Sequence, residues 1–571
     1  MSDVQTAAEA ARPTILGHPR GLVVLFFAEM WERFSYYGMR TLLVLFLVQH
    51  LLFDDTEAAG VYAAYAALVY LMPIIGGALA DRWLGARKAV TIGALLLVAG
   101  HFAMAFEGAG AKQFLTIGGQ EYQVTADGRG QDRQLHAVVD GVRTPIDISP
   151  KGVTRDPALA STLPAHTPVG QFATRQERDT RGEATLFLAM SLIIAGVGFL
   201  KANISTVVGA LYEQGDRRRD AGFTLFYVGV NLGSLLSQLL CGWIGITYGW
   251  KYGFGLAGIG MLLGLIVFLV GQPWLEGRAG PPDEAKLKRP VFGVPMEALF
   301  WIGGIVAVVP IWLLLQRHEL VQGALSVIAP AIFGGMILWS ILALRGAERS
   351  RMLVALILTI FSVLFWVLFE QAGSSLTLFA DRSTELPSWL NAGQAHFVNP
   401  LSIIILGPIF AAMWQALGAR GLEPPTPYKF SIALALVGAG FLVLVWAIET
   451  QAGPDFRVAF TWLAVAYVLH SVAELFLSPI GLSMITKLSV QKMVGLMMGV
   501  WFLSSALAHS LAGLVAQMTA SDTVGGVVVD PAAALNTYGA VFNQIGWAAV
   551  ITGGVLFLLS PVLKRMMAGV K

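Results

Sequence analysis

The sequence is poor in charged residues and has a single cysteine. Asp, Glu, Lys and Arg make up 13% of its 571 residues, whereas 56% are hydrophobic and the mean hydropathy is +0.67. A soluble protein carries about twice that charged fraction. Because Cys241 is the only cysteine, an intrachain disulfide and a thiolate metal cluster are both excluded. This composition predicts a protein with many membrane-spanning segments.

Several functional signals are also missing. The chain contains no G-x-x-x-x-G-K-[ST] loop, so we expect no ATP-driven step. It shows no metal-ligand cluster and no nucleophile triad, so we expect neither a cofactor nor an enzyme. Its net charge of +2 gives no indication of a nucleic-acid partner. Residues 1–19 lack an apolar stretch, so no cleavable signal peptide is expected and the first span would direct insertion.

Long hydrophobic runs dominate the rest of the chain, and about fourteen of them can cross a bilayer as helices. Glycine, with 63 residues, suits close helix packing in a membrane. The fold class predicted is therefore an all-α integral membrane protein. The expected spans lie near 21–53, 57–82, 88–108, 183–213, 220–248, 252–272, 293–316, 322–344, 352–380, 392–418, 428–449, 457–486, 493–519 and 538–563.

Positive charges gather in every second short loop, which indicates orientation. The loop at 520–537 has none, whereas the C-terminal tail carries Lys564, Arg565 and Lys571. An even number of spans with both termini in the cytoplasm satisfies this pattern. The basic loops are 83–88, 212–220, 273–290, 345–351, 419–429 and 487–492.

The segment 109–182 breaks the pattern, because it is basic and falls on the outer side. Loops longer than ~60 residues escape the charge rule. Residues 120–124 and 136–143 read as short strands beside Gly and Asp turns. We expect a small β-hairpin that is partly disordered toward 162–180. A passive role is favoured over receptor docking.

Charged residues inside the first span are the exception to its apolar composition. Charge at bilayer depth is expensive, and ionisable residues there are usually functional. The spacing i, i+3, i+4, i+7, i+8, i+11 puts the polar residues on one helix face. The opposite face, with Phe27, Trp31, Phe34 and Leu42, suits lipid. The polar stripe consists of Glu29, Glu32, Arg33, Tyr36, Tyr37 and Arg40.

This stripe allows two interpretations. It could be an ion-pair network that only locks helices together, or a proton-titrating face turned toward a substrate. Two acids within one helical turn cannot both ionise cheaply, so one of them should hold a proton near neutral pH. This favours the second interpretation.

The run 29–40 resembles the E-x-x-E-R-F-x-Y-Y-G-M-R signature of the proton-coupled oligopeptide transporter (POT/PTR) family, a branch of the major facilitator superfamily. Further resemblances span nearly all the helical parts, in order, whereas Val490 and the 109–182 insertion depart from the family pattern. The matching runs are 76–88, 226–235, 365–376, Asn399-Pro400, Glu474-Leu475 and Ser478-Pro479 with Gly481.

The resemblance implies a domain organisation. It predicts two six-helix bundles with two extra helices between them, the extra pair lying at 293–344. The divisions expected are an N-terminal tail at 1–20, a first bundle at 21–272, a linker with the extra pair at 273–348, a second bundle at 349–563 and a tail at 564–571.

The resemblance also implies roles for particular residues. Glu29, Glu32 and Arg33 would couple protons, with Glu32 as the main carrier. The implied peptide-binding residues are Tyr36, Tyr37, Arg40, Tyr70, Lys201, Asn231, Trp366, Glu370, Asn399, Glu474, Ser478 and Trp501.

Gates and a latch complete the implied machinery. Lys201 and Glu474 would form an inner gate, although a permanent bridge is the alternative. Arg40 and Asp381 would close an outer gate, unless Arg382 neutralises Asp381 locally. A conformational latch, or a simple topology signal, would consist of Asp81, Arg82, Arg87 and Lys88. Packing roles are expected for His101, His470 and His509.

The function implied is proton-coupled symport of di- and tripeptides into the cell by alternating access. Cations can bind the peptide carboxylate and acids its ammonium group. Nitrate, an amino acid or a peptide-like drug remains an alternative solute, although the intact stripe disfavours nitrate. A non-transporting peptide sensor is disfavoured by the short loops. We expect a monomer in the inner (plasma) membrane, with peptides, protons and lipid as its only partners.

Overall fold

The computed structural model describes residues 14–213, 216 and 218–569. Parts of the two predicted tails (1–13 and 570–571) and Arg217 of one basic turn lie outside the described residues. Thirteen described helices are long and apolar enough to cross a membrane. A further long helix, α2 (Gly21–Gln49), is not among these thirteen, and it carries four charged side chains. It is the fourteenth span expected from the sequence. The all-α membrane fold is thus confirmed.

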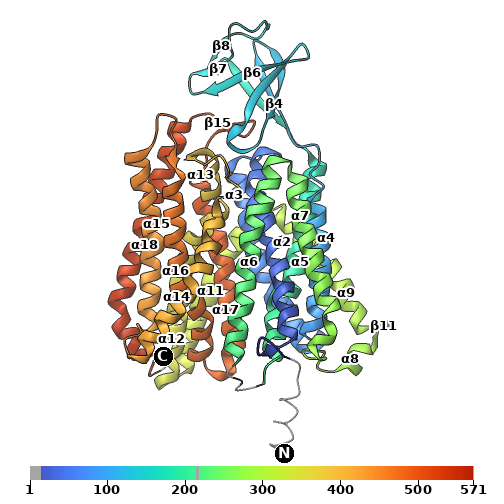
Figure 1. Ribbon diagram of the computed structural model, residues 1–571, viewed down its shortest axis with the longest axis vertical. Helices are drawn as coiled ribbons and strands as arrows, with labels where there is room; N and C mark the ends of the chain where they lie inside the picture. Colours follow the sequence, from blue (N-terminus) through green and yellow to red (C-terminus); the bar gives the residue numbers. More distant parts are fainter. Residues whose placement is uncertain (1–13, 214–215, 217, 570–571) are drawn as a thin grey trace, which may run out of the picture.

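Two groups of long helices stand side by side, with α2 in one group and α18 in the other (Figure 1). In the first group, called the N-half, α2 packs against α6 and α7, and α4 packs against α5. In the second, called the C-half, α15 packs against α16 and α18, and α3 meets α17 between the halves. The N-half has α2, α3 (Asp55–Leu79), α4 (Ala86–Met104), α5 (Thr180–Ala210), α6 (Arg218–Thr247) and α7 (Trp250–Val270). The C-half has α12 (Gly346–Phe369), α13 (Ser375–Arg382), α14 (Val398–Ala419), α15 (Thr426–Gln451), α16 (Phe460–Leu488), α17 (Val494–Gln517) and α18 (Pro531–Met566).

The chain between the halves forms the predicted extra pair of spans. One span consists of α9 (Met296–Val306) and α10 (Val308–Leu315), and the other is α11 (His318–Ala343). The short helix α8 (Glu284–Lys288) precedes them. α10 packs against α5, and α11 packs against α3 and α17.

The first span of the C-half is broken before its last eight residues. α12 ends at Phe369, a 3-10 turn follows at Glu370–Gly373, and α13 begins at Ser375. A Cβ atom on Gly373 would lie 1.8 Å from the hydroxyl of Tyr62 and 2.8 Å from Nε of Arg40. Glycine at this position therefore lets two polar side chains of the N-half approach the broken helix.

The apolar face of α2 meets protein more than lipid, which corrects the expectation from its sequence. Phe34 and Leu42 are buried, and only Phe27 is 42% exposed. Leu42 fills the space beside Gly245, and Phe34 that beside Gly260. Small residues on α6 and α7 thus let α2 sink between its neighbours.

The 109–182 insertion is a folded β unit, and the prediction of a small, partly disordered hairpin is wrong. Seven strands, antiparallel throughout, pair in the order β8-β7-β6-β5-β4-β3-β9. They are β3 (Lys112–Ile117), β4 (Gln120–Asp127), β5 (Gln134–Val139), β6 (Val142–Ser149), β7 (Gly152–Thr154), β8 (His166–Pro168) and β9 (Phe172–Glu177). Alternating apolar residues such as Leu115, Val124 and Leu135 bury one face.

This sheet, called the insert, stands on the helices at the end opposite to the C-terminal end of α18 (Figure 1). We call this the insert end of the molecule. Asp179 anchors the insert at its base, because its carboxylate accepts from the backbone N–H groups of Ala109, Gly110 and Gly182. Asp179 also caps the first turn of α5.

Candidate functional site

The polar stripe of α2 faces the protein interior, and its first part forms a compact charge cluster. Arg33 Nη2 donates to Glu32 Oε1 at 2.7 Å, and Arg33 Nε also donates to Glu32. The same Nε lies 3.3 Å from Glu29 Oε1. All three side chains are buried, and Glu29 Oε2 has no hydrogen-bond partner among the described residues. One arginine thus stands between two buried acids, so a proton on either acid changes the balance of the cluster.

Arg40, further along the stripe, links the two halves. Its Nη2 donates to Glu370 Oε2, and its Nε donates to the hydroxyl of Tyr62 at 2.5 Å. Glu370 is buried in this ion pair, and the side chain of Arg40 is 10% exposed. The predicted Arg40–Asp381 gate pair is therefore wrong for this structure. The break after α12 turns Glu370 toward α2, so that the glutamate reaches Arg40 first.

Asp381 and Arg382 lie at the insert end with other partners. Gln49 Nε2 donates to Asp381 Oδ2 at 2.8 Å. Arg382 makes a bidentate pair with Asp55, at 2.5 and 2.7 Å, in which both side chains are buried. Arg382 thus forms its ion pair with Asp55 and not with the neighbouring Asp381, contrary to the alternative left open by the sequence. These contacts join α2 and α3 to α13 and close the insert end.

Lys201 sits at the middle of α5, against an aromatic ring. Its Nζ lies 3.4 Å from the ring centroid of Tyr70, a cation–π contact. The expected Lys201–Glu474 pair is not formed in this structure. Glu474 instead accepts from Asn399 Nδ2 at 3.3 Å. The two groups therefore lie on opposite halves and have different partners in this structure.

The remaining predicted binding residues come from several helices. Asn231 Nδ2 donates to the Tyr227 carbonyl of its own helix, and the buried Trp366 Nε1 has no hydrogen-bond partner in the part of the chain that the structure describes. Trp501 rests on Gly481, where a Cβ atom would come within 2.5 Å of the indole. Tyr36 and Tyr37 stack edge to face, with centroids 5.2 Å apart. Ser478 is half-buried on α16, one turn after Glu474.

The structure also gives His509 contacts that the sequence did not predict. His509 on α17 stacks on Tyr70, with ring centroids 4.4 Å apart, and its Nε2 lies 3.4 Å from Glu370 Oε2. The expectation of a packing role for His509 is therefore too narrow. A polar chain runs from Lys201 through Tyr70 and His509 to Glu370. The other two histidines are buried, with His470 on the Val437 carbonyl and His101 among apolar neighbours.

The basic turn after α3 is bonded to the linker (273–348) between the halves. Lys88 Nζ donates to Glu297 Oε2 at 2.7 Å, at the start of α9, and the Arg87 amide donates to the Ala279 carbonyl. Asp81 and Arg82 lie in a π-helical turn, Ala80–Leu84. The role of these charges as a conformational latch stays a prediction.

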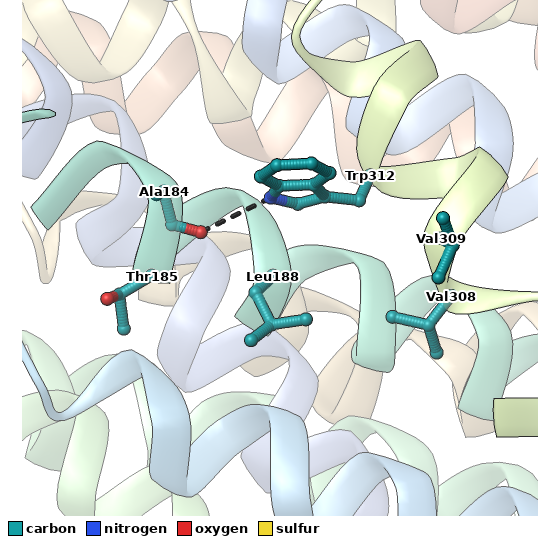
Figure 2. A pocket seen from close by; sticks show the side chains of 6 residues that line it. All are labelled: Ala184, Thr185, Leu188, Val308, Val309 and Trp312. Atoms are coloured by element: carbon teal, nitrogen blue, oxygen red, sulfur yellow. Dashed lines mark hydrogen bonds between the residues drawn. The ribbon is translucent and has the colours of Figure 1, made fainter. Parts of the chain in front are cut away.

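A crevice between α5 and α10 does not suit a zwitterion (Figure 2). Its volume is about 390 Å³, and none of the six residues that line it is ionisable. Trp312 points into it and donates its indole N–H to the Ala184 carbonyl at 3.3 Å. The hydrogen bond of Trp312 therefore ties α10 to α5 of the N-half. The lining of the crevice offers mainly apolar contact.

Comparisons with known proteins agree with this geometry. A model of the POT family matches residues 87–529. The chain is 33% identical over 567 residues to the uncharacterized transporter YclF of Bacillus subtilis (strain 168), which covers 97% of this chain and 96% of that protein. It is 31% identical over 556 residues to dipeptide and tripeptide permease A of Edwardsiella piscicida, with 96% of each chain covered. The crystal structure of a peptide transporter POT in complex with sulfate matches with a TM-score of 0.72 and 31% identity, covering 99% of this chain and all of that chain.

Proposed function

Because the chain belongs to the POT family, we propose that it carries di- and tripeptides with protons into the cell, by alternating access. The observation that carries this proposal is the buried cluster of Glu29, Glu32 and Arg33 beside charges of both signs on the two halves. A cluster of this kind is expensive in a membrane and is retained for function. The multi-pass protein is placed in the inner (plasma) membrane, acts as a monomer and needs no cofactor besides the proton gradient.

The charges near the midplane suit a short peptide. A peptide has a carboxylate at one end and an ammonium group at the other. Arg40 and Lys201 supply cations for the first, and Glu370 and Glu474 supply acids for the second. Tyr36, Tyr37, Asn231 and Asn399 can bond the peptide amide. Aromatic walls from Tyr70, Trp366 and Trp501, with Ser478 at one side, leave the peptide's side chains loosely specified.

In this proposal, proton binding is coupled to peptide transport because Glu29 and Glu32 compete for Arg33. A proton on Glu32 or Glu29 removes one of the two anions that hold the guanidinium. If that proton favours one gate state, proton binding shifts the equilibrium between states, and peptide affinity shifts with it. In this cycle Glu32 is the main carrier and Glu29 the second. The Lys201–Glu474 pair would close the inner side after the peptide has been released there.

Orientation completes the proposal. The basic loops place both termini in the cytoplasm and the insert outside. With this orientation, the closed insert end would be the outer side. Asp81, Arg82, Arg87 and Lys88 lie at the cytoplasmic ends of α3 and α4, where they would hold the halves in one state.

Peptide-induced proton flux in liposomes tests the function. With the purified protein in vesicles that contain a pH dye, alanyl-alanine should drive saturable proton entry, and protein-free vesicles should show none. Nitrate and free alanine are run as separate arms. Proton flux with nitrate or alanine, and none with the dipeptide, would contradict the proposal.

A further inference from the structure

The insert is attached to the N-half. Its first strand, β3, follows α4, and its last strand, β9, leads into α5, so both chain connections run to helices of the N-half. Besides the contacts of Asp179, the Ala111 amide donates to the His50 carbonyl at the end of α2, at 3.0 Å, and Arg178 forms an ion pair with Glu57 of α3. The insert is therefore expected to move with the N-half whenever the two halves move relative to each other.

One loop of the insert also reaches the C-half. Residues 130–133, which we call the clip, connect β4 to β5. Gln131 Nε2 donates to two backbone carbonyls of the C-half, that of Ala380 in α13 at 2.9 Å and that of Thr384 just beyond this helix at 2.5 Å. The clip thus holds the end of the broken first span of the C-half.

Arg133 of the clip bridges the two halves by itself. Its Nη2 donates to the Gln49 carbonyl of α2 at 2.7 Å, and its Nε donates to the Gly525 carbonyl, between α17 and α18, at 2.7 Å. Burial lowers the pKa of Arg133 to about 10, against the opposing effect of Asp381, so the guanidinium remains charged at neutral pH. Hydrogen bonds from a charged donor are stronger than those between neutral groups. Arg133 is therefore a firm link between the halves.

A glycine lets the clip approach the boundary between the halves closely. The Gly130 amide donates to Gln49 Oε1 on the N-half at 3.1 Å. Its φ of +65° is one that residues with a side chain rarely adopt, and a Cβ atom there would lie 3.4 Å from Oδ1 of Asp381. Gln49 donates to the same Asp381 carboxylate. The clip therefore lies over the contact between α2 and α13.

The loop 523–528 of the C-half is seated against the insert. Gly525 has a φ of +56°, and a Cβ atom there would lie 2.9 Å from Cδ2 of Leu135 in the core of the insert. Its amide donates to Gln113 Oε1 of β3 at 3.4 Å. Val527 packs against the same core. The insert thus contacts the C-half at α13 and at this loop.

Separation of the halves at the insert end would break one set of these contacts. The contacts to the N-half can persist because the insert is anchored there, whereas Gln131 and Arg133 would have to leave their carbonyls on the C-half. A polar group that loses a buried partner costs free energy until water replaces that partner. Asp381 and Arg382, which join the halves directly, line one cavity with Gly130, Gln131 and Arg133. The clip therefore adds to a closure that is already formed by the helices.

We propose that the insert is a third part of the gate at the insert end, which moves with the N-half and must release Ala380, Thr384 and Gly525 before this end can open. The inference rests on the alternating access of the proposed function. A passive insert would need no contact with the C-half. If the clip only stabilised the fold of the insert, its loss would leave the distance between the halves unchanged.

The test measures the distance between the halves at the insert end. Thr247, at the end of α6, and Gln451, at the end of α15, are exposed and lie on opposite halves. Both are changed to cysteine in a Cys241→Ala background and carry nitroxide spin labels, whose separation is measured by double electron–electron resonance in lipid nanodiscs. Gln131→Ala with Arg133→Ala should raise the ratio of long-distance to short-distance molecules about fivefold or more, the lower end of usual coupling between sites.

A matched control removes two arginines that do not touch the C-half. Arg143 and Arg175 form ion pairs with Asp127 and Glu121, all within the insert. Arg143→Ala with Arg175→Ala should leave the distance distribution as it is in the parent. A ratio that is the same in the clip variant and in this control would overturn the inference.

A second variant guards against misfolding of the insert. Gln131→Glu keeps the size of the side chain but turns an acceptor toward the two carbonyl oxygens of Ala380 and Thr384, so it should also raise the ratio. A parent-like ratio in Gln131→Glu would likewise contradict the proposed gate. Because the measurement needs no peptide, its result is separate from that of the flux assay. Absence of peptide-induced proton flux in the parent would overturn the proposed function and leave the distance result standing.

Discussion

At the scale of single residues, spacing along α2 was enough to predict that its polar stripe faces the interior, although not that much of its apolar face is buried too. Glu29, Glu32 and Arg33 do form one buried cluster. The partners across the halves could not be predicted in the same way. Arg40 meets Glu370 rather than Asp381 because a break in the facing helix, which has no clear sequence signal, decides which acid comes within reach.

His509 shows the same limit. A histidine in an apolar run is most often a packing residue, and the sequence contains nothing near it to indicate otherwise. Its contact with Glu370 depends on how α17 sits beside α12, a packing arrangement that spacing within one helix does not contain. His509 faces the site because α17 also packs along α3.

Glu474 allows a residue-scale prediction. Glu474→Gln removes an anion proposed to bind the peptide ammonium, so the KM for free dipeptides should rise about tenfold, which corresponds to about 1.4 kcal/mol. Peptides with an acetylated amino terminus lack that ammonium, and their KM should not change. The measurement is inhibition of labelled dipeptide counterflow by the two kinds of peptide. An equal loss of affinity for both kinds would remove Glu474 from this role.

At the scale of elements, the length and hydropathy of the runs predicted nearly all the helices. The insert was predicted poorly. Two of its strands, β7 and β8, have only three residues each, which is too short to show alternation. β9 pairs with β3, about sixty residues earlier in the chain, and such distant pairing cannot be read from local pattern. The break after Phe369 was missed because no proline marks it and the turn Glu370–Gly373 lies inside a longer hydrophobic run.

Gly373 offers a test of that break. Gly373→Ala places a methyl group where Tyr62 and Arg40 approach, so the Arg40–Glu370 link should be strained and peptide counterflow should fall at least about tenfold, a cost of the size expected for overpacking. Gly407→Ala in α14 is the control, since a Cβ atom there meets nothing within 4 Å. Counterflow that is equal in both variants would show that close approach at Gly373 is unimportant.

The closed insert end provides a stability prediction. Asp55→Asn leaves Arg382 buried without its counter-charge, which costs about 3–5 kcal/mol. Asp54→Ala, at the exposed neighbour that caps α3, should cost only about 1 kcal/mol. Thermal unfolding in detergent measures both. If the two variants unfold at the same temperature, the buried pair does not stabilise this closure.

At the scale of the whole molecule, the halves differ in how they carry charge. The N-half holds the cluster that competes for Arg33, and the C-half supplies Glu370, His509 and Glu474. Arg40 and the insert-end contacts tie the halves in one state, and the unpaired Lys201 and Glu474 are available for the other. A transporter that rocks about a midplane site requires such alternative pairings. The account depends on a proton deciding between them.

The most direct test of that claim compares uphill uptake with exchange in one variant, Glu32→Gln. In liposomes with an imposed pH gradient, the parent should accumulate labelled dipeptide above its external concentration. Glu32→Gln should lose this accumulation because its amide cannot exchange a proton, while counterflow without a gradient should remain within about twofold of the parent. Undiminished uphill accumulation in Glu32→Gln would contradict the account.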